Sequence, residues 1–158
     1  MGKMFSGCEI VELAVQIEKN GKEFYTRLKA LADNDEARGV FESLAKAEDR
    51  HIAVFRKIFD ASCNYSPEGS FPDEYFSFMN SLASSYVFTR ADKAEELIES
   101  IKTFREAVEL GIELEKDSIL FYEEMKRSIP ESSHETVDRI IDEEKQHFKK
   151  LCDLKGGC

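Results

Sequence analysis

Several features are scarce or missing in this 158-residue sequence, and each absence narrows what the chain can be. No apolar run approaches the roughly 20 residues needed to cross a bilayer, so we expect no membrane-spanning helix. The first residues lead into a segment interrupted by Glu9, Glu12 and Glu18, which is unlike a signal peptide. The chain has only three prolines and long segments of helical periodicity, which predict one all-α domain.

Cysteines are few and scattered. The four of them form no Cys-x-x-Cys motif, which excludes a zinc site built from two such thiolate pairs. Their spacing is also unlike a disulfide framework. The simplest interpretation is a protein with reduced thiols in the cytoplasm. The cysteines are Cys8, Cys63, Cys152 and Cys158.

Basic residues are outnumbered by acidic ones, and the formal net charge is −10. Such a charge repels phosphate backbones and anionic lipids, so we expect no nucleic-acid partner and no binding to a membrane surface. Some of this negative charge would be cancelled if carboxylates held cations.

Two segments of the sequence, residues 12–25 and 109–122, share the same pattern. Glu18 corresponds to Glu115 and Tyr25 to Tyr122, both at an offset of 97 residues. Each copy is followed by a Glu-x-x-His motif, and the second motif lies 96 residues after the first. The two motifs are Glu48–His51 and Glu144–His147. Two halves of the chain therefore each provide one carboxylate and one carboxylate–imidazole pair.

The apolar spacing divides the single domain, residues 1–158, into a helical hairpin at 6–59, a crossover at 60–103 and a second hairpin at 104–153. Capping boxes at Ser6–Glu9 and Thr103–Glu106 are predicted to open the hairpins. A connection this long is typical of a four-helix bundle in which the joined helices are parallel. We therefore predict a bundle with short helices, one beginning near Pro72, that pack over it.

The repeated residues are predicted to face the core of this bundle. Glu48 and His51 lie three apart within an apolar stripe, so both can point at one place, and Glu144 and His147 do the same. Four carboxylates in one core would repel one another, and two divalent cations would balance their charge. Carboxylate and imidazole ligands suit iron or manganese, with zinc as an alternative. The predicted metal ligands are Glu18, Glu48, His51, Glu115, Glu144 and His147.

Two further features accompany these ligands. Tyr25 and Tyr122 lie two turns beyond Glu18 and Glu115 on the same helix faces, so each hydroxyl could donate to a ligand carboxylate on another helix. The alternative is a core aromatic ring with its hydroxyl at an edge. A third Glu-x-x-His match, at residues 131–134, follows a proline and lacks an apolar surround, so we predict that it lies at the surface.

This set of motifs resembles the ferritin-like di-iron carboxylate superfamily, and within it the rubrerythrin branch. The resemblance covers both hairpins and implies a ferritin-like four-helix bundle with two iron ions. It further implies that Glu18 and Glu115 are terminal ligands, and that Glu48 and Glu144 bridge the metals. His51 and His147 would then bind one metal each.

The sequence departs from the rubrerythrin pattern in two respects. Rubrerythrins usually carry another glutamate on the third bundle helix, which exchanges with a histidine as ligand. Three residues after Glu115 this chain has Ser118, and three residues after Glu18 it has Gly21. Rubrerythrins also usually have a rubredoxin-like iron–thiolate domain, for which this sequence has neither the length nor the cysteines.

The resemblance implies a cytoplasmic non-haem di-iron oxidoreductase that reduces peroxide or dioxygen, in the manner of a rubrerythrin peroxidase acting in oxidative defence. Its electrons would come from a separate donor protein, and the family favours a homodimer. Two alternatives remain open on the sequence. One is a ferroxidase or iron-handling protein, and the other is a metal-binding module without turnover.

Overall fold

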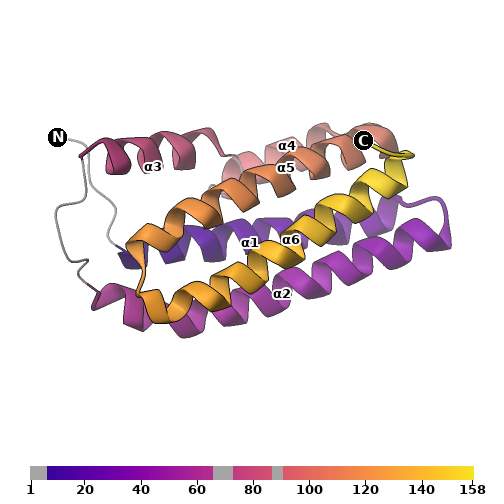
Figure 1. The fold of residues 1–158 in the computed structure, drawn as a ribbon. Helices are drawn as coiled ribbons and strands as arrows, with labels where there is room; N and C mark the ends of the chain where they lie inside the picture. Colours follow the sequence, from indigo (N-terminus) through magenta and orange to yellow (C-terminus); the bar gives the residue numbers. More distant parts are fainter. Residues whose placement is uncertain (1–6, 66–72, 87–90) are drawn as a thin grey trace.

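A computed structural model describes residues 7–65, 73–86 and 91–158, and these form an all-α bundle (Figure 1). The predicted cap at Ser6 and the helix start at Pro72 lie outside the described residues. Two short 3-10 turns connect the last two long helices, η2 (Lys126–Ser128) and η3 (Glu131–Ser133). The helices are α1 (Gly7–Leu31), α2 (Asp35–Cys63), α3 (Asp73–Ser85), α4 (Ala91–Ser100), α5 (Phe104–Met125) and α6 (His134–Lys155).

The bundle consists of two antiparallel hairpins, α1–α2 and α5–α6 (Figure 1). The segment between the hairpins returns along the length of the bundle, so α5 runs in the same direction as α2 (Figure 1). Within it, α4 contacts α1 and α3 contacts α5. The prediction of an all-α ferritin-like bundle whose crossover packs over it is therefore confirmed.

Polar caps fix where the long helices begin. The side chain of Asn34 accepts a hydrogen bond from the Ala37 amide at 2.8 Å, which satisfies a backbone donor that the first turn of α2 leaves open. The hydroxyl of Thr103 accepts from the Glu106 amide at 3.2 Å at the start of α5. The caps set the register of each helix and thereby the direction in which its inward carboxylates point.

The end of α6 corrects the prediction made from the cysteine spacing. Gly156 and Gly157 have positive φ angles of 97° and 108°, a conformation that costs glycine little. They turn the chain back on itself, so that the Cα atoms of Cys152 and Cys158 lie 5.2 Å apart and a disulfide joins the two side chains. The expectation of reduced thiols throughout was wrong for this pair, because the spacing alone does not reveal the turn.

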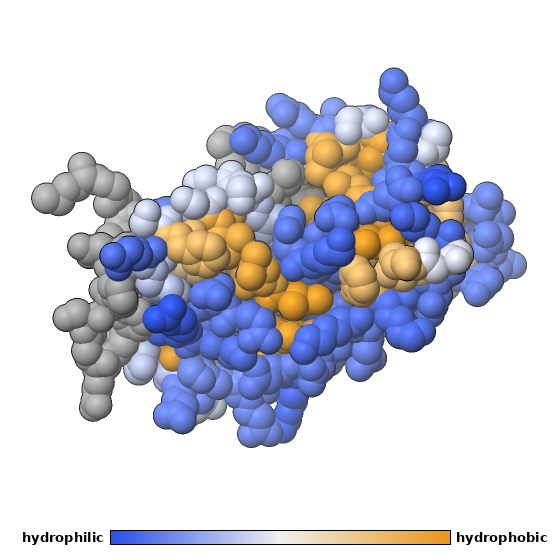
Figure 2. Space-filling view, turned by 45° about the horizontal axis from the view of Figure 1, so that its top comes forward, coloured by the Kyte–Doolittle hydropathy of each residue, from blue (hydrophilic) through white to orange (hydrophobic). Residues whose placement is uncertain are grey.

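Aromatic rings fill much of the core, and the largest fully buried side chains include Phe24, Phe41, Phe55 and Tyr122. The face shown in Figure 2 is mostly hydrophilic, with apolar patches between the polar side chains. Among the described residues, the exposed large apolar side chains are Leu31, Phe78 and Leu120. None of the described helices has the length and hydrophobicity required to span a membrane.

Two helical glycines give a matched test of how tightly the hairpins pack. A Cβ at Gly7 would lie 2.9 Å from the Ser62 carbonyl oxygen and would also collide with the Ser128 carbonyl, whereas one at Gly39 would meet nothing within 4 Å. We expect Gly7→Ala to lower the free energy of unfolding by about 1–3 kcal/mol. Gly39→Ala should raise it by about 0.5–1 kcal/mol because alanine is the better helix former. Urea denaturation of both variants measures this, and equal effects would contradict the described packing.

Candidate metal centre

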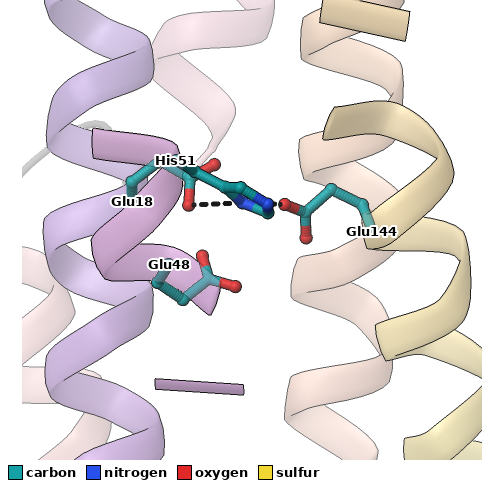
Figure 3. A group of neighbouring side chains, drawn as sticks. All are labelled: Glu18, Glu48, His51 and Glu144. Atoms are coloured by element: carbon teal, nitrogen blue, oxygen red, sulfur yellow. Dashed lines mark hydrogen bonds and ion pairs between the residues drawn. The ribbon is translucent and has the colours of Figure 1, made fainter. Parts of the chain in front are cut away.

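The six predicted ligands meet in the middle of the bundle, although they come from four different helices. Helix α1 provides Glu18 and α5 provides Glu115, while α2 and α6 each provide a Glu-x-x-His pair. Figure 3 shows how Glu18, Glu48, His51 and Glu144 converge from three of these helices. None of the six residues is more than 4% exposed, so the cluster is shielded from solvent.

The cluster divides into two overlapping groups. In the first, one ligand atom each from Glu18, Glu48, His51 and Glu144 lie within 4.8 Å of one another. The second has the same compactness and consists of Glu48, Glu115, Glu144 and His147. Glu48 and Glu144 belong to both groups. A cation in each group would therefore have one terminal carboxylate, one imidazole and two shared carboxylates.

Both imidazoles turn the same nitrogen towards the carboxylates. Nδ1 of His51 lies 2.8 Å from Glu144 Oε1 and 3.3 Å from Glu18 Oε2. Nδ1 of His147 lies 3.1 Å from Glu144 Oε2 and 3.2 Å from Glu48 Oε1. The two rings lie 5.8 Å apart between centroids and are nearly parallel. This orientation makes Nδ1 the nitrogen that each histidine can offer to a cation.

Two carboxylate oxygens in the cluster have no hydrogen bond of their own. Oε1 of Glu48 and Oε1 of Glu144 are fully buried and accept no hydrogen bond from the described residues. Each nevertheless lies close to an imidazole Nδ1. A buried carboxylate oxygen that accepts no hydrogen bond is costly, and a cation bound by this oxygen and the imidazole would reduce that cost. The donor set of four carboxylates and two imidazoles therefore fits a pair of divalent metal ions.

Proton affinities within the cluster are strongly perturbed. Burial, followed by the charge of Glu144, raises the pKa of Glu48 and of Glu115 well above the usual value of 4.5. Burial alone would also raise the pKa of Glu144, but the hydrogen bond from His147 and the close contact with His51 lower it. Burial opposes the charged form of His51, yet its contacts with Glu144 and Glu18 raise its pKa to about 11. Without metal, protons on Glu48, Glu115 and His51 would therefore offset part of the negative charge.

Each repeated tyrosine bonds to a carboxylate of the other half of the chain. The hydroxyl of Tyr25 on α1 donates a hydrogen bond to Glu115 on α5. The hydroxyl of Tyr122 on α5 donates to Glu18 on α1 at 2.5 Å. Both tyrosines are buried. The reciprocal bonds hold the two single carboxylates in place and connect the two hairpins across the centre of the bundle.

Gly21 and Ser118, the two positions that depart from the rubrerythrin pattern, are each closely packed against another side chain. A Cβ at Gly21 would lie 2.9 Å from Glu48 Oε2, so the glycine leaves room for that carboxylate. Ser118 donates a hydrogen bond to the Leu114 carbonyl at 3.0 Å, and its hydroxyl lies 2.6 Å from that of Tyr86. Because Tyr86 comes from the crossover, the crossover covers the α5 position where rubrerythrins usually carry their extra glutamate. Neither position provides a carboxylate.

Glu143 is a neighbour of the cluster that the sequence did not reveal. Its Oε2 lies 3.0 Å from Nε2 of His51, on the ring edge opposite the predicted metal-facing nitrogen. At the same offset of 96 residues the first half has Ala47, so this feature has no counterpart there. The contact depends on how α2 and α6 align. The sequence does not indicate it, because Glu143 is one of several adjacent acidic residues in α6. A carboxylate in this position fixes the tautomer and orientation of a ligand histidine.

The third Glu-x-x-His match lies outside the cluster. Glu131 is exposed, and His134 is partly buried with its Nε2 3.3 Å from the Ile129 carbonyl oxygen. Neither residue belongs to either group of candidate ligands among the described residues. The structure thus places Glu131 in η3 and His134 at the first position of α6, outside both ligand groups.

Comparison with known proteins agrees with this geometry. The family model for rubrerythrin matches residues 9–155, which is nearly the whole chain. The structure is similar to that of a putative ferritin-like diiron-carboxylate protein from Thermotoga maritima, with a TM-score of 0.70 and 28% sequence identity. That similarity covers 98% of this chain and 97% of the other. No curated protein matches the sequence.

Removing a shared carboxylate should affect both metals at once. We expect Glu48→Gln to lose most of the bound metal, because an amide cannot supply the charge that both groups share. The matched control is Glu131→Gln, from the surface Glu-x-x-His, which should bind as much metal as the unmodified protein. Elemental analysis after loading with Mn²⁺ and desalting measures the metal-to-protein ratio. Full metal content in Glu48→Gln, or a loss in Glu131→Gln, would remove Glu48 from the site.

The raised pKa values of Glu48 and Glu115 predict how stability depends on pH. A carboxyl whose pKa is higher in the folded than in the unfolded state stabilises the fold at low pH, and loses that effect as pH rises above about 4.5. The raised pKa of His51 acts in the same direction. The lowered pKa of Glu144 matters only below about 4.5.

Metal-free protein should therefore melt at a lower temperature at pH 8 than at pH 5.5, and stabilisation by Mn²⁺ should be larger at pH 8. Melting curves with chelator and with Mn²⁺ at both pH values measure the two effects. Equal stabilisation by Mn²⁺ at the two pH values would show that metal does not displace protons from these carboxyls.

Proposed function

Because this chain belongs to the rubrerythrin family, we propose that it is a non-haem di-iron oxidoreductase that reduces peroxide or dioxygen. The observation that carries the proposal is the pair of overlapping ligand groups, with two buried carboxylate oxygens that accept no hydrogen bond from the described residues. Glu18 and Glu115 would be terminal ligands, and Glu48 and Glu144 would be shared. His51 and His147 would each offer Nδ1. Iron held by these residues would supply the electrons that break an O–O bond.

The surrounding residues support this chemistry by holding the ligands and excluding water. Tyr25 and Tyr122 fix Glu115 and Glu18 through hydrogen bonds, so these carboxylates keep one orientation. Their hydroxyl groups are the nearest neutral proton donors to the terminal carboxylates, since burial raises the pKa of both phenols well above 10. Reduction of peroxide to water consumes two electrons and two protons. Buried phenols at this position can stabilise negative charge that builds up on the carboxylates.

The residues Gly21 and Ser118, neither of which has a carboxylate, distinguish this centre from that of the usual rubrerythrin. No carboxylate at these two positions can exchange with a histidine, so we propose that the cycle runs with one fixed set of ligands. We propose that the electrons come from a separate donor protein. Iron is the proposed metal, with manganese or zinc as alternatives, and a cytoplasmic homodimer remains a prediction.

Stopped-flow absorption spectroscopy tests the proposed activity. The full chain, loaded anaerobically with Fe(II), is mixed with hydrogen peroxide or with dioxygen. We expect the charge-transfer bands of an oxidised di-iron centre to appear after mixing with either oxidant. They should appear faster with hydrogen peroxide than with dioxygen. A faster reaction with dioxygen that continues as more Fe(II) is added would favour a ferroxidase.

A loaded centre that reacts with neither oxidant would instead indicate a metal-binding module without turnover, and would contradict the proposal. Glu131→Gln serves as the matched control, since it keeps the centre and should react like the unmodified protein. Glu48→Gln should show only the slow oxidation of free Fe(II).

A further inference from the structure

A second pair of reactive side chains lies at the end of the bundle where α1 begins and α2 ends (Figure 1). Cys8 lies in the first turn of α1 and is partly buried, whereas Cys63 is the last residue of α2 and is exposed. The Cys63 thiol lies within hydrogen-bonding reach of Cys8. These two cysteines are not joined, in contrast to Cys152 and Cys158.

The backbones next to the two cysteines are in direct contact. A Cβ added to Gly7 would lie 2.9 Å from the carbonyl oxygen of Ser62, and these residues immediately precede Cys8 and Cys63. Ser62 is buried, so the contact belongs to the packed end of the hairpin. Disulfide bonds need such proximity, because the Cα atoms of bonded cysteines are usually about 4.4–6.8 Å apart.

We propose that Cys8 and Cys63 are a redox-active dithiol that becomes an intramolecular disulfide by exchange with a low-molecular-weight disulfide. The exposed Cys63 receives the incoming molecule, and Cys8 completes the bond. This reaction needs no metal, so it is independent of the oxidoreductase function proposed above.

The exchange proceeds in two balanced steps. The thiolate of Cys63 attacks one sulfur of the small disulfide, the S–S bond breaks, and the other half leaves as a thiol after taking up the proton. Cys8, once deprotonated, then attacks the sulfur of Cys63 in the mixed disulfide. This forms the Cys8–Cys63 bond and releases the second small thiol. Two protein thiols are oxidised, and one small disulfide is reduced to two thiols.

The environment of Cys63 favours the disulfide as product but makes its formation slow. The hydrogen bond with Cys8, followed by partial desolvation and the charge of Cys8, raises the pKa of Cys63 to about 11, and the carboxylates of Asp60 and Glu12 add to this effect. Because the Cys63 thiolate is not stabilised, the reduced dithiol is not favoured over the disulfide, and the pair should be a good reductant. The small thiolate fraction at neutral pH slows the attack, so the rate should rise as the pH rises.

Space for the incoming molecule exists beside the pair. A groove between α1 and α2 begins at Glu12, one turn after Cys8, and at Phe59, one turn before Cys63. It carries apolar and charged side chains of both signs, so it offers room without a preference for one charge. The groove is lined by Glu12, Val15, Gln16, Lys19, Arg56 and Phe59.

Mass spectrometry of the full chain after thiol trapping tests the proposal. The protein is reduced, desalted without added iron and incubated with glutathione disulfide at pH 8, and remaining thiols are then blocked with N-ethylmaleimide. We expect peptides that carry Cys8 and Cys63 to be recovered as one linked species, with no glutathione retained on either. Recovery of both residues as maleimide adducts, or both as stable glutathione adducts, would overturn the proposal.

Two sets of variants complete the experiment. Cys8→Ser should stop at the mixed disulfide, with one glutathione retained on Cys63. The double variant Cys152→Ser and Cys158→Ser should form the Cys8–Cys63 link as the unmodified protein does. The link should also raise the melting temperature by roughly 5–10 °C, because it closes a long loop of the unfolded chain. An equal rise in Cys8→Ser, or no link in the double variant, would contradict the assignment.

Discussion

The burial of four carboxylates in one helical core is the constraint on which the rest of this structure depends. Side chains such as Glu18 and Glu144 are almost completely shielded from water, where an ionised carboxylate without a partner is costly. Two histidines, two tyrosine hydroxyl groups and, as we propose, two cations stabilise these buried carboxylates. Gly21 belongs to the same solution, because a larger residue would press on Glu48. A core of this kind is stable only when its charges are balanced, so binding and folding are coupled.

The two halves of the chain stabilise the buried carboxylates in nearly the same way, but they are not equivalent. Tyr25 and Tyr122 exchange hydrogen bonds between α1 and α5, so each half fixes a ligand of the other. Among the described residues, a further carboxylate, that of Glu143, contacts the outer ring edge of His51, and no such contact is found for His147. The crossover breaks the symmetry again where Tyr86 meets Ser118 on α5. The two predicted metal positions therefore have different surroundings.

Much of this architecture could be predicted from the sequence because the features that determine it recur. The repeated spacing of Glu18, Tyr25 and the Glu-x-x-His motifs predicted the bundle, and the structure brings the six predicted ligands and both tyrosines together at its centre. Features that depend on the alignment of two helices or on a turn were missed. Glu143 contacts His51 only because of the register between α2 and α6, and Cys158 reaches Cys152 only because two glycines adopt positive φ angles. The proximity of Cys8 and Cys63 likewise follows from helix lengths that periodicity fixes only to within a few residues.

The most direct measurement of the central claim is anomalous diffraction at the iron absorption edge from crystals of protein grown with Fe(II). The account predicts two peaks inside the bundle, about 3.5–4 Å apart as in other two-metal sites. Glu48 and Glu144 would contact both peaks, and His51 and His147 one each. A single peak, no peak, or iron bound only to surface carboxylates would contradict the idea that the two halves of the chain combine to hold a metal pair.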